Sequence, residues 1–136
     1  MKDVKQPPAI GAMWPDQGGI YAGIIGGENG APDYYLIHAD SEYEIIDVNH
    51  ATAIQSARAP IYGFDDWSLP DRREARLLTI NSPDSFNENE LYWTSEEDEY
   101  YTCDAWTQDF SHGYQAGSYK ADKLRARAVR RVAIVK

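Results

Sequence analysis

The chain has 136 residues, of which 43% are hydrophobic and 12% aromatic, so it is long and apolar enough to form one packed domain. Its formal net charge of −9 disfavours nucleic acid as a partner, because phosphate binding depends on clustered Lys and Arg. The single cysteine, Cys103, excludes an intramolecular disulfide, and we expect a buried, inert thiol. The apolar runs fall short of the roughly 20 residues of a membrane-spanning helix, so no membrane association is expected.

The N-terminal residues 1–15 are polar and contain Pro7, Pro8 and Pro15, which is typical of an extended arm with little structure of its own. We therefore expect residues 16–136 to form a single domain. The opening MKDVKQPPAIGAMW also lacks the apolar core of a signal peptide. This predicts a protein that is made in the cytoplasm without a signal peptide.

Two β-prone runs follow the arm, GGIYAGIIGG at residues 18–27 and YYLIHAD at 34–40. Between them, Asn29 and Gly30 tolerate positive φ, so the runs should form a hairpin with a loop longer than the minimum. Glycines inside the first run indicate that another element packs closely against it.

Two helices are predicted in the middle of the chain. After a short strand at residues 44–48, Asn49 can cap a brief helix over 50–58. The stronger signal is LPDRREARLLTINSP, residues 69–83, in which Asp71 and Glu74 have the spacing of a capping box. Its apolar residues Leu77, Leu78 and Ile80 are expected to face the core.

Strands return in the last third. In AWTQDF, residues 105–110, side chains alternate between two faces, and the following Ser-His-Gly is expected to turn the chain into YQAGSYK. A final strand is predicted over residues 124–135, with an apolar face interrupted by Arg130, while Arg125, Arg127 and Arg131 face elsewhere. An inward Arg130 requires a carboxylate or carbonyl partner.

Charge is distributed unevenly along the chain. Residues 81–110 contain nine acidic residues and no Lys or Arg, whereas residues 121–136 contain six basic residues and one acidic residue. The pattern favours a basic strand lying beside acidic segments of the same domain, and the alternative is a basic tail that binds a separate anionic partner.

Four segments in this order, FDDWSLPDRREARLL, LYWTSEE, AWTQDFSHGY and LRARAVRRV, resemble the Lcl C-terminal-domain family of bacterial and phage proteins. Family members show a W-R-L-P-T-x-x-E-like helix opening, a Y-W-S-S-like strand entry, an A-W-x-x-x-F-x-x-G hairpin and a closing V-R-A-V-R strand. The resemblance covers residues 64–134, and the preceding hairpin is similar to the front half of short phage-encoded members. Ser68 stands where an Arg is usual, and Asp71 and Thr94 stand where Thr and Ser are usual.

The resemblance implies an α+β, C-type-lectin-like fold: small twisted antiparallel sheets, about two helices, and paired N- and C-terminal strands. Related families are the sulfatase-modifying enzymes and the variable proteins that determine phage tropism. By this resemblance Trp93 and Trp106 form the framework, and a set of ligand-binding residues is displayed on it: Asp98, Glu99, Tyr100, Tyr101, Asp104, His112, Tyr114 and Tyr119.

The residue types also support a binding surface. Tyrosine offers a large, rigid contact area at low entropic cost, and acidic neighbours select against anionic partners. The expected function is therefore a non-catalytic binding module for a protein or glycan on a host surface or virion, displayed in several copies as a homo-oligomer. An ordinary solvated acidic loop is the plainer interpretation.

The same residues bear on three other functions. Sulfatase-modifying chemistry uses paired cysteines, and here Cys103 stands alone. The histidines are scattered and the sugar-binding E-P-N, Q-P-D and W-N-D signatures are absent, which argues against a catalytic metal and a calcium-dependent lectin. We therefore expect no catalytic residues, metal or cofactor. A soluble phage-encoded inhibitor of a host factor, whose acidic surface imitates nucleic acid, remains an alternative.

Overall fold

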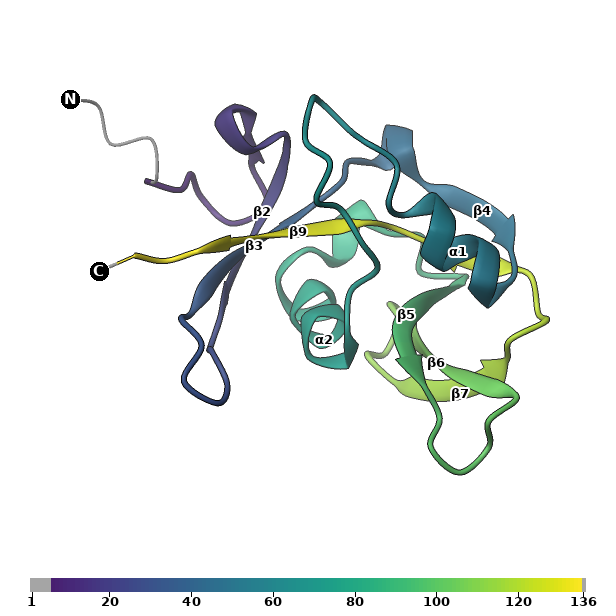
Figure 1. Ribbon diagram of the computed structural model, residues 1–136. Helices are drawn as coiled ribbons and strands as arrows, with labels where there is room; N and C mark the ends of the chain where they lie inside the picture. Colours follow the sequence, from purple (N-terminus) through teal and green to yellow (C-terminus); the bar gives the residue numbers. More distant parts are fainter. Residues whose placement is uncertain (1–5, 136) are drawn as a thin grey trace.

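The computed structural model describes residues 6–135 and contains two sheets and two α-helices (Figure 1). The first sheet has the order β1-β2-β3-β9 and is antiparallel; its strands are Met13–Trp14, Gly19–Ile25, Tyr34–His38 and Val129–Ala133. The second is mixed, with the order β4-β8-β5-β6-β7; its strands are Ile45–Val48, Leu124–Ala126, Leu91–Glu97, Asp104–Asp109 and Gln115–Tyr119. This architecture confirms the predicted small α+β fold.

Helices lie between and beside the sheets. The α-helices are α1, His50–Ser56, and α2, Arg72–Asn81, and three short 3-10 helices cover Pro15–Gln17, Ser41–Tyr43 and Pro83–Ser85. Both predicted caps are present. The Asn49 side chain accepts the Thr52 amide at 2.9 Å, and Asp71 and Glu74 form the reciprocal capping box.

The N-terminal hairpin forms as the glycines predict. Asn29 and Gly30 have φ values of 56° and 84° in the loop between β2 and β3. A Cβ on Gly19 would lie 2.6 Å from the carbonyl oxygen of His38, so β2 can approach β3 only with glycine at that position. The C-terminal strand β9 pairs with β3 of this hairpin, whereas the first strand β1 lies at the opposite edge of the same sheet.

Part of the expected N-terminal arm belongs to the fold. Residues 1–5 of the arm lie outside the described residues, but Met13 and Trp14 form β1. The Trp14 ring is 4% exposed and lies 5.5 Å and 5.4 Å, between ring centroids, from Tyr21 and Tyr35. Burial of the indole provides apolar contact that the polar composition of this segment does not reveal.

The C-terminal segment differs from the single predicted strand. It forms β8 in the second sheet and β9 in the first, and Figure 1 shows the chain running from one into the other. Arg127, between the two strands, is 2% exposed, so the expectation that it faces away from the core is wrong. It donates to Glu44, Ala39 and Ser85. Since the break between the strands interrupts the alternation, the period-two pattern cannot place it.

Arg130 has the partners that its inward position requires. Its Nε atom lies 2.6 Å from Asp66 Oδ1, and its guanidinium also donates to the Gln17 carbonyl oxygen at 2.8 Å. The prediction for Arg130 is therefore confirmed. In α2, by contrast, Ile80 is 69% exposed, so its expected inward orientation is wrong. It lies two residues, about 200°, beyond the buried Leu78.

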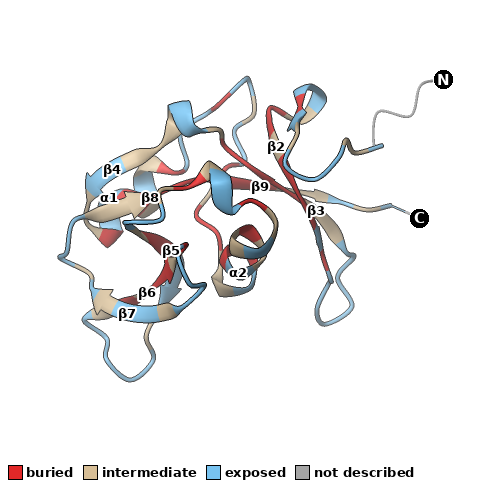
Figure 2. Ribbon diagram, turned by 180° about the vertical axis from the view of Figure 1, so that it is seen from behind, coloured by how far each residue is buried: buried red, intermediate tan, exposed pale blue. Residues whose placement is uncertain are grey.

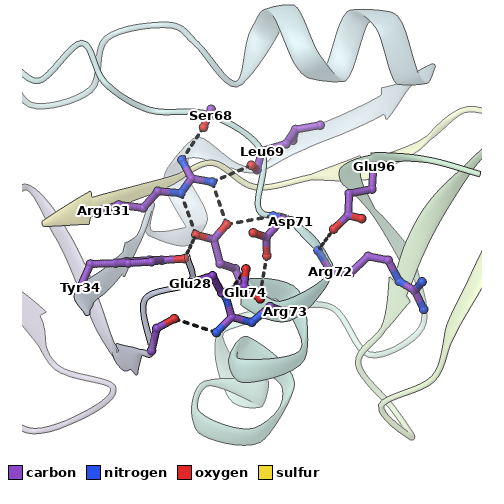
Figure 3. Close-up of polar contacts among 11 residues, drawn as sticks. Glu28, Tyr34, Ser68, Leu69, Asp71, Arg72, Arg73, Glu74, Glu96 and Arg131 are labelled. Atoms are coloured by element: carbon purple, nitrogen blue, oxygen red, sulfur yellow. Dashed lines mark hydrogen bonds and ion pairs between the residues drawn. The ribbon is translucent and has the colours of Figure 1, made fainter. Parts of the chain in front are cut away.

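The buried carboxylate of Glu74 joins α2 to the first sheet (Figure 3). Glu74 is 0% exposed and accepts two hydrogen bonds of 2.7 Å from Arg131, one of 2.6 Å from the Tyr34 hydroxyl and one of 2.9 Å from the Asp71 amide. Burial by itself raises the pKa of the Glu74 carboxyl, but Arg131 and Tyr34 outweigh it and hold the pKa below its usual value. The carboxylate is therefore charged and fully partnered.

We expect the two framework tryptophans to differ in their contribution to stability. Trp93 is 0% exposed and donates from its indole to the Val48 carbonyl oxygen at 2.9 Å, so Trp93→Ala should cost about 3–5 kcal/mol. Trp106 is only half-buried, so Trp106→Ala should cost clearly less. Urea denaturation of both variants measures the difference, and equal losses would contradict it.

The buried His38 makes stability depend on pH. Burial lowers the pKa of His38 to about 4, a hydrogen bond to the Ala39 carbonyl opposes this, and the charge of Arg127 adds to it. An unfolded histidine has a pKa of about 6.5. Between these values the unfolded chain binds more protons than the folded chain, so stability is lost as the pH falls.

From pH 7 to pH 5 the free energy of unfolding should therefore fall by about 2 kcal/mol through His38 alone. Urea denaturation across this range measures the slope. His38→Asn should flatten it, while the exposed His112 offers a matched control in His112→Gln, which should leave it unchanged. A His38→Asn variant with the full wild-type slope would show that other groups cause it.

Candidate binding surface

The loop between β5 and β6, residues 98–103, is held by its own polar groups. The Asp98 carboxylate accepts the backbone amides of Tyr100 and Tyr101 at 2.9 Å and 3.2 Å. The backbone amide of Asp98 donates to the Asp104 carbonyl oxygen at 3.0 Å across the base of the loop. An aspartate that bonds the amides two and three residues ahead stabilises a tight turn.

The tyrosines of this loop point into solvent. Tyr100 and Tyr101 are 89% and 70% exposed, and Figure 2 shows the loop as an exposed projection beyond β6. Beside it, Tyr101, Asp104 and Tyr119 line an open hollow together with Thr102 and Cys103. Cys103 is exposed, so the prediction of a buried thiol is wrong. The loop reverses direction there, and its side chains have no core to enter.

Trp106 belongs to the surface more than to the framework. The Arg72 guanidinium carbon lies 3.7 Å above the centre of its ring. Arg72 is the first residue of α2, its amide donates to Glu96 at 2.8 Å, and its Nε donates to the Gln115 side chain at 2.9 Å. A second hollow is lined by these groups and the loop: Arg72, Glu96, Glu97, Asp98, Glu99, Tyr100 and Trp106.

Gln115 connects this surface to the interior. Its side-chain amide donates to the Arg72 carbonyl oxygen and to the Gln108 side chain, both at 2.8 Å, and its oxygen accepts from Arg76 at 3.0 Å. Sequence reasoning missed Arg72 and Gln115. Arg72 sits directly after the predicted N-cap Asp71, but only the packing of α2 on the second sheet brings it over Trp106.

The eight predicted ligand-binding residues fall into two groups. Six of them gather around the loop and the adjacent ends of β6 and β7: Asp98, Glu99, Tyr100, Tyr101, Asp104 and Tyr119. His112 and Tyr114 lie in the turn at the other end of β6, with ring centroids 5.8 Å apart. A strand of six residues is roughly 20 Å long, so the second group does not join the first.

Negative charge at the loop is only partly compensated. Glu97 pairs with Lys120, whose hydrogen bond and charge lower the pKa of the Glu97 carboxyl. Within residues 6–135, no salt bridge joins Asp98, Glu99 or Asp104 to a basic side chain. Three uncompensated carboxylates beside exposed tyrosines form a surface that attracts cationic and hydrogen-bond-donating groups.

The three histidines lie in different environments, on separate parts of the chain. His38 and His50 are buried, and His50 Nε2 is 2.9 Å from the Thr94 carbonyl oxygen, whereas His112 is exposed. In the described part of the chain, no three His, Cys, Asp or Glu side chains are grouped as metal ligands.

The arrangement is that of a small α+β domain which presents a polar, aromatic loop on the β5–β6 hairpin. The Lcl C-terminal domain matches residues 11–130, which is most of the chain, so the protein belongs to the Lcl C-terminal domain family. The match extends the resemblance seen in the sequence through the N-terminal hairpin. A search of curated proteins finds no match. Among the described residues, no helix is long and apolar enough to cross a membrane.

Loss of the Asp98 carboxylate should loosen the loop. Asp98→Ala removes the acceptor for two backbone amides and should cost about 1 kcal/mol, with faster hydrogen exchange at Tyr100 and Tyr101. Asp98→Asn keeps an acceptor oxygen and should preserve slow exchange. Hydrogen exchange measured by NMR compares the two variants, and identical rates would show that the loop is held by other contacts.

Proposed function

We propose that the protein is a non-catalytic binding module that recognises a protein or glycan on a host surface or on a virion. The recognition surface is the group of six residues around the β5–β6 loop. The observation that carries the proposal is the pair of solvent-exposed rings of Tyr100 and Tyr101 on a loop whose backbone is ordered by Asp98. A preordered aromatic surface loses little entropy on binding.

The chemistry of the surface supports recognition without reaction. Its side chains are tyrosines, carboxylates, one threonine, one thiol, Arg72 and Trp106. A nucleophilic Cys103 would need an adjacent base, and the hollow that contains Cys103 is lined by Tyr101, Thr102, Asp104 and Tyr119. We therefore propose a function that depends on contact, with affinity increased by display in several copies.

The second candidate is a soluble, phage-encoded inhibitor of a host factor. It is favoured by the uncompensated carboxylates of Asp98, Glu99 and Asp104, which could occupy a basic surface in place of nucleic acid. Sedimentation separates the candidates. A monomer that binds its partner tightly at one-to-one supports the inhibitor, and an oligomer with weak individual sites supports display.

The test begins with arrays of host-surface proteins, virion proteins and glycans. For any partner found, the double variant Tyr100→Ala with Tyr101→Ala should weaken binding at least tenfold, because buried tyrosine anchors typically contribute about 2 kcal/mol each. Its melting temperature should stay close to that of the wild type, since both rings are exposed.

Tyr62→Ala is the matched control, because Tyr62 is 53% exposed and lines a different hollow with Met13 and Pro15. It should bind like the wild type. If the tyrosine double variant binds its partner at full strength, the loop is not the recognition surface.

A further inference from the structure

β7 is an open edge of the second sheet. In the strand order β4-β8-β5-β6-β7 it pairs, among the described residues, only with β6. Natural proteins usually block exposed edges with charge, proline or a bulge, and this strand, QAGSY, carries neither charge nor proline.

The hydrogen-bond register shows which backbone groups face outward. The Asp109 amide donates to the Tyr114 carbonyl oxygen and the Lys120 amide to the Cys103 carbonyl oxygen, both at 2.8 Å. Bonded and non-bonded pairs alternate along an antiparallel ladder. The backbone groups of residues 115, 117 and 119 therefore point away from β6. The Tyr119 carbonyl oxygen accepts from the Asp122 amide at 2.9 Å, which leaves Gln115 and Gly117 for pairing with an added strand.

A space beside Gly117 adds side-chain specificity to this edge. Gly117 lies opposite Trp106 on β6. A Cβ on Gly117 would lie 3.3 Å from Asp104 Oδ2 and 3.6 Å from Asp98 Oδ2. Because Gly117 has no side chain, both carboxylates remain accessible from the edge. A residue paired with Gly117 in an added strand would place its side chain beside them.

We propose that β7 accepts an extended segment of a basic partner protein as a sixth strand of the sheet, with a Lys or Arg beside Gly117 that binds the Asp98 and Asp104 carboxylates. Backbone bonds to Gln115 and Gly117 supply affinity, and the two carboxylates select the cation. The inference rests on the proposed function and specifies that the partner presents an extended, basic segment. A second copy of this chain fits less well, because each copy carries a formal charge of −9.

The probe is a nine-residue synthetic peptide of alternating Thr and Lys, which favours an extended strand with cations on one face. It should bind the full-length protein in a titration followed by amide NMR, with Gln115 and Gly117 amides shifted and protected from exchange. Two control peptides should not bind: the same design with Glu in place of Lys, and one with Pro at every second position.

The variants separate backbone pairing from charge. Gly117→Pro removes an outward amide without breaking the ladder to β6. An edge strand tolerates proline at a position whose amide faces away from the sheet. It should weaken peptide binding about fivefold or more. Gly117→Ala adds the same Cβ but keeps the amide, so it is the control for the new contact with Asp104. Thermal denaturation of both variants checks that they remain folded. Asp98→Asn with Asp104→Asn should weaken the Lys peptide about tenfold.

Three results would overturn the proposal. Equal binding to the Gly117→Pro and Gly117→Ala variants would leave only charge attraction. Absence of binding by the Thr-Lys peptide would remove the edge as a site. A protein dimer in sedimentation that Gly117→Pro dissociates would assign the edge to a second copy. If the tyrosine double variant loses a partner that Gly117→Pro still binds, the proposed function stands and the edge-strand proposal fails. If the Thr-Lys peptide binds but the arrays yield no partner, the edge-strand proposal stands without support for the proposed function.

Discussion

The fold depends on the buried ion pair between Glu74 and Arg131. The carboxylate is inaccessible to solvent and is bonded by side chains from β3 and β9 as well as by the amide that begins α2. Removal of Arg131 would leave the buried Glu74 carboxylate without a cationic partner, at a cost of about 3–5 kcal/mol. The same pair fixes where α2 starts, and therefore where Arg72, two residues earlier, meets Trp106.

Packing against the core and hydrogen bonds to α2 fix the positions of the strands that present the surface. Trp93 and Thr107 lie on the face of the second sheet that packs into the core, while Trp106 and Gly117 lie on the opposite face. Gln115 connects the outer strand to α2 through Arg72. A binding loop placed on such a hairpin can expose its tyrosines without needing to order them when a partner arrives.

Local patterns in the sequence predicted the elements well. The caps at Asn49 and Asp71 and the positive-φ residues of the first hairpin act within a few residues of chain, so their consequences are the same in any fold. The predictions were wrong for Ile80, which is exposed, and for Arg127, which is buried. Trp106 was predicted as framework but is only half-buried. Each depends on which neighbour covers it, and periodicity within one element contains no information about the neighbour.

The sequence by itself determined the α+β class, the two helices with their caps, the requirement of Arg130 for a partner and the family to which the chain belongs. The tertiary structure decided which charges are buried together, that the last segment divides between two sheets, and that the predicted binding residues form two groups at opposite ends of β6. These features arise from contacts between residues far apart in the chain. Their energies depend on distance and burial in space, which only the folded packing of α2 and the two sheets defines.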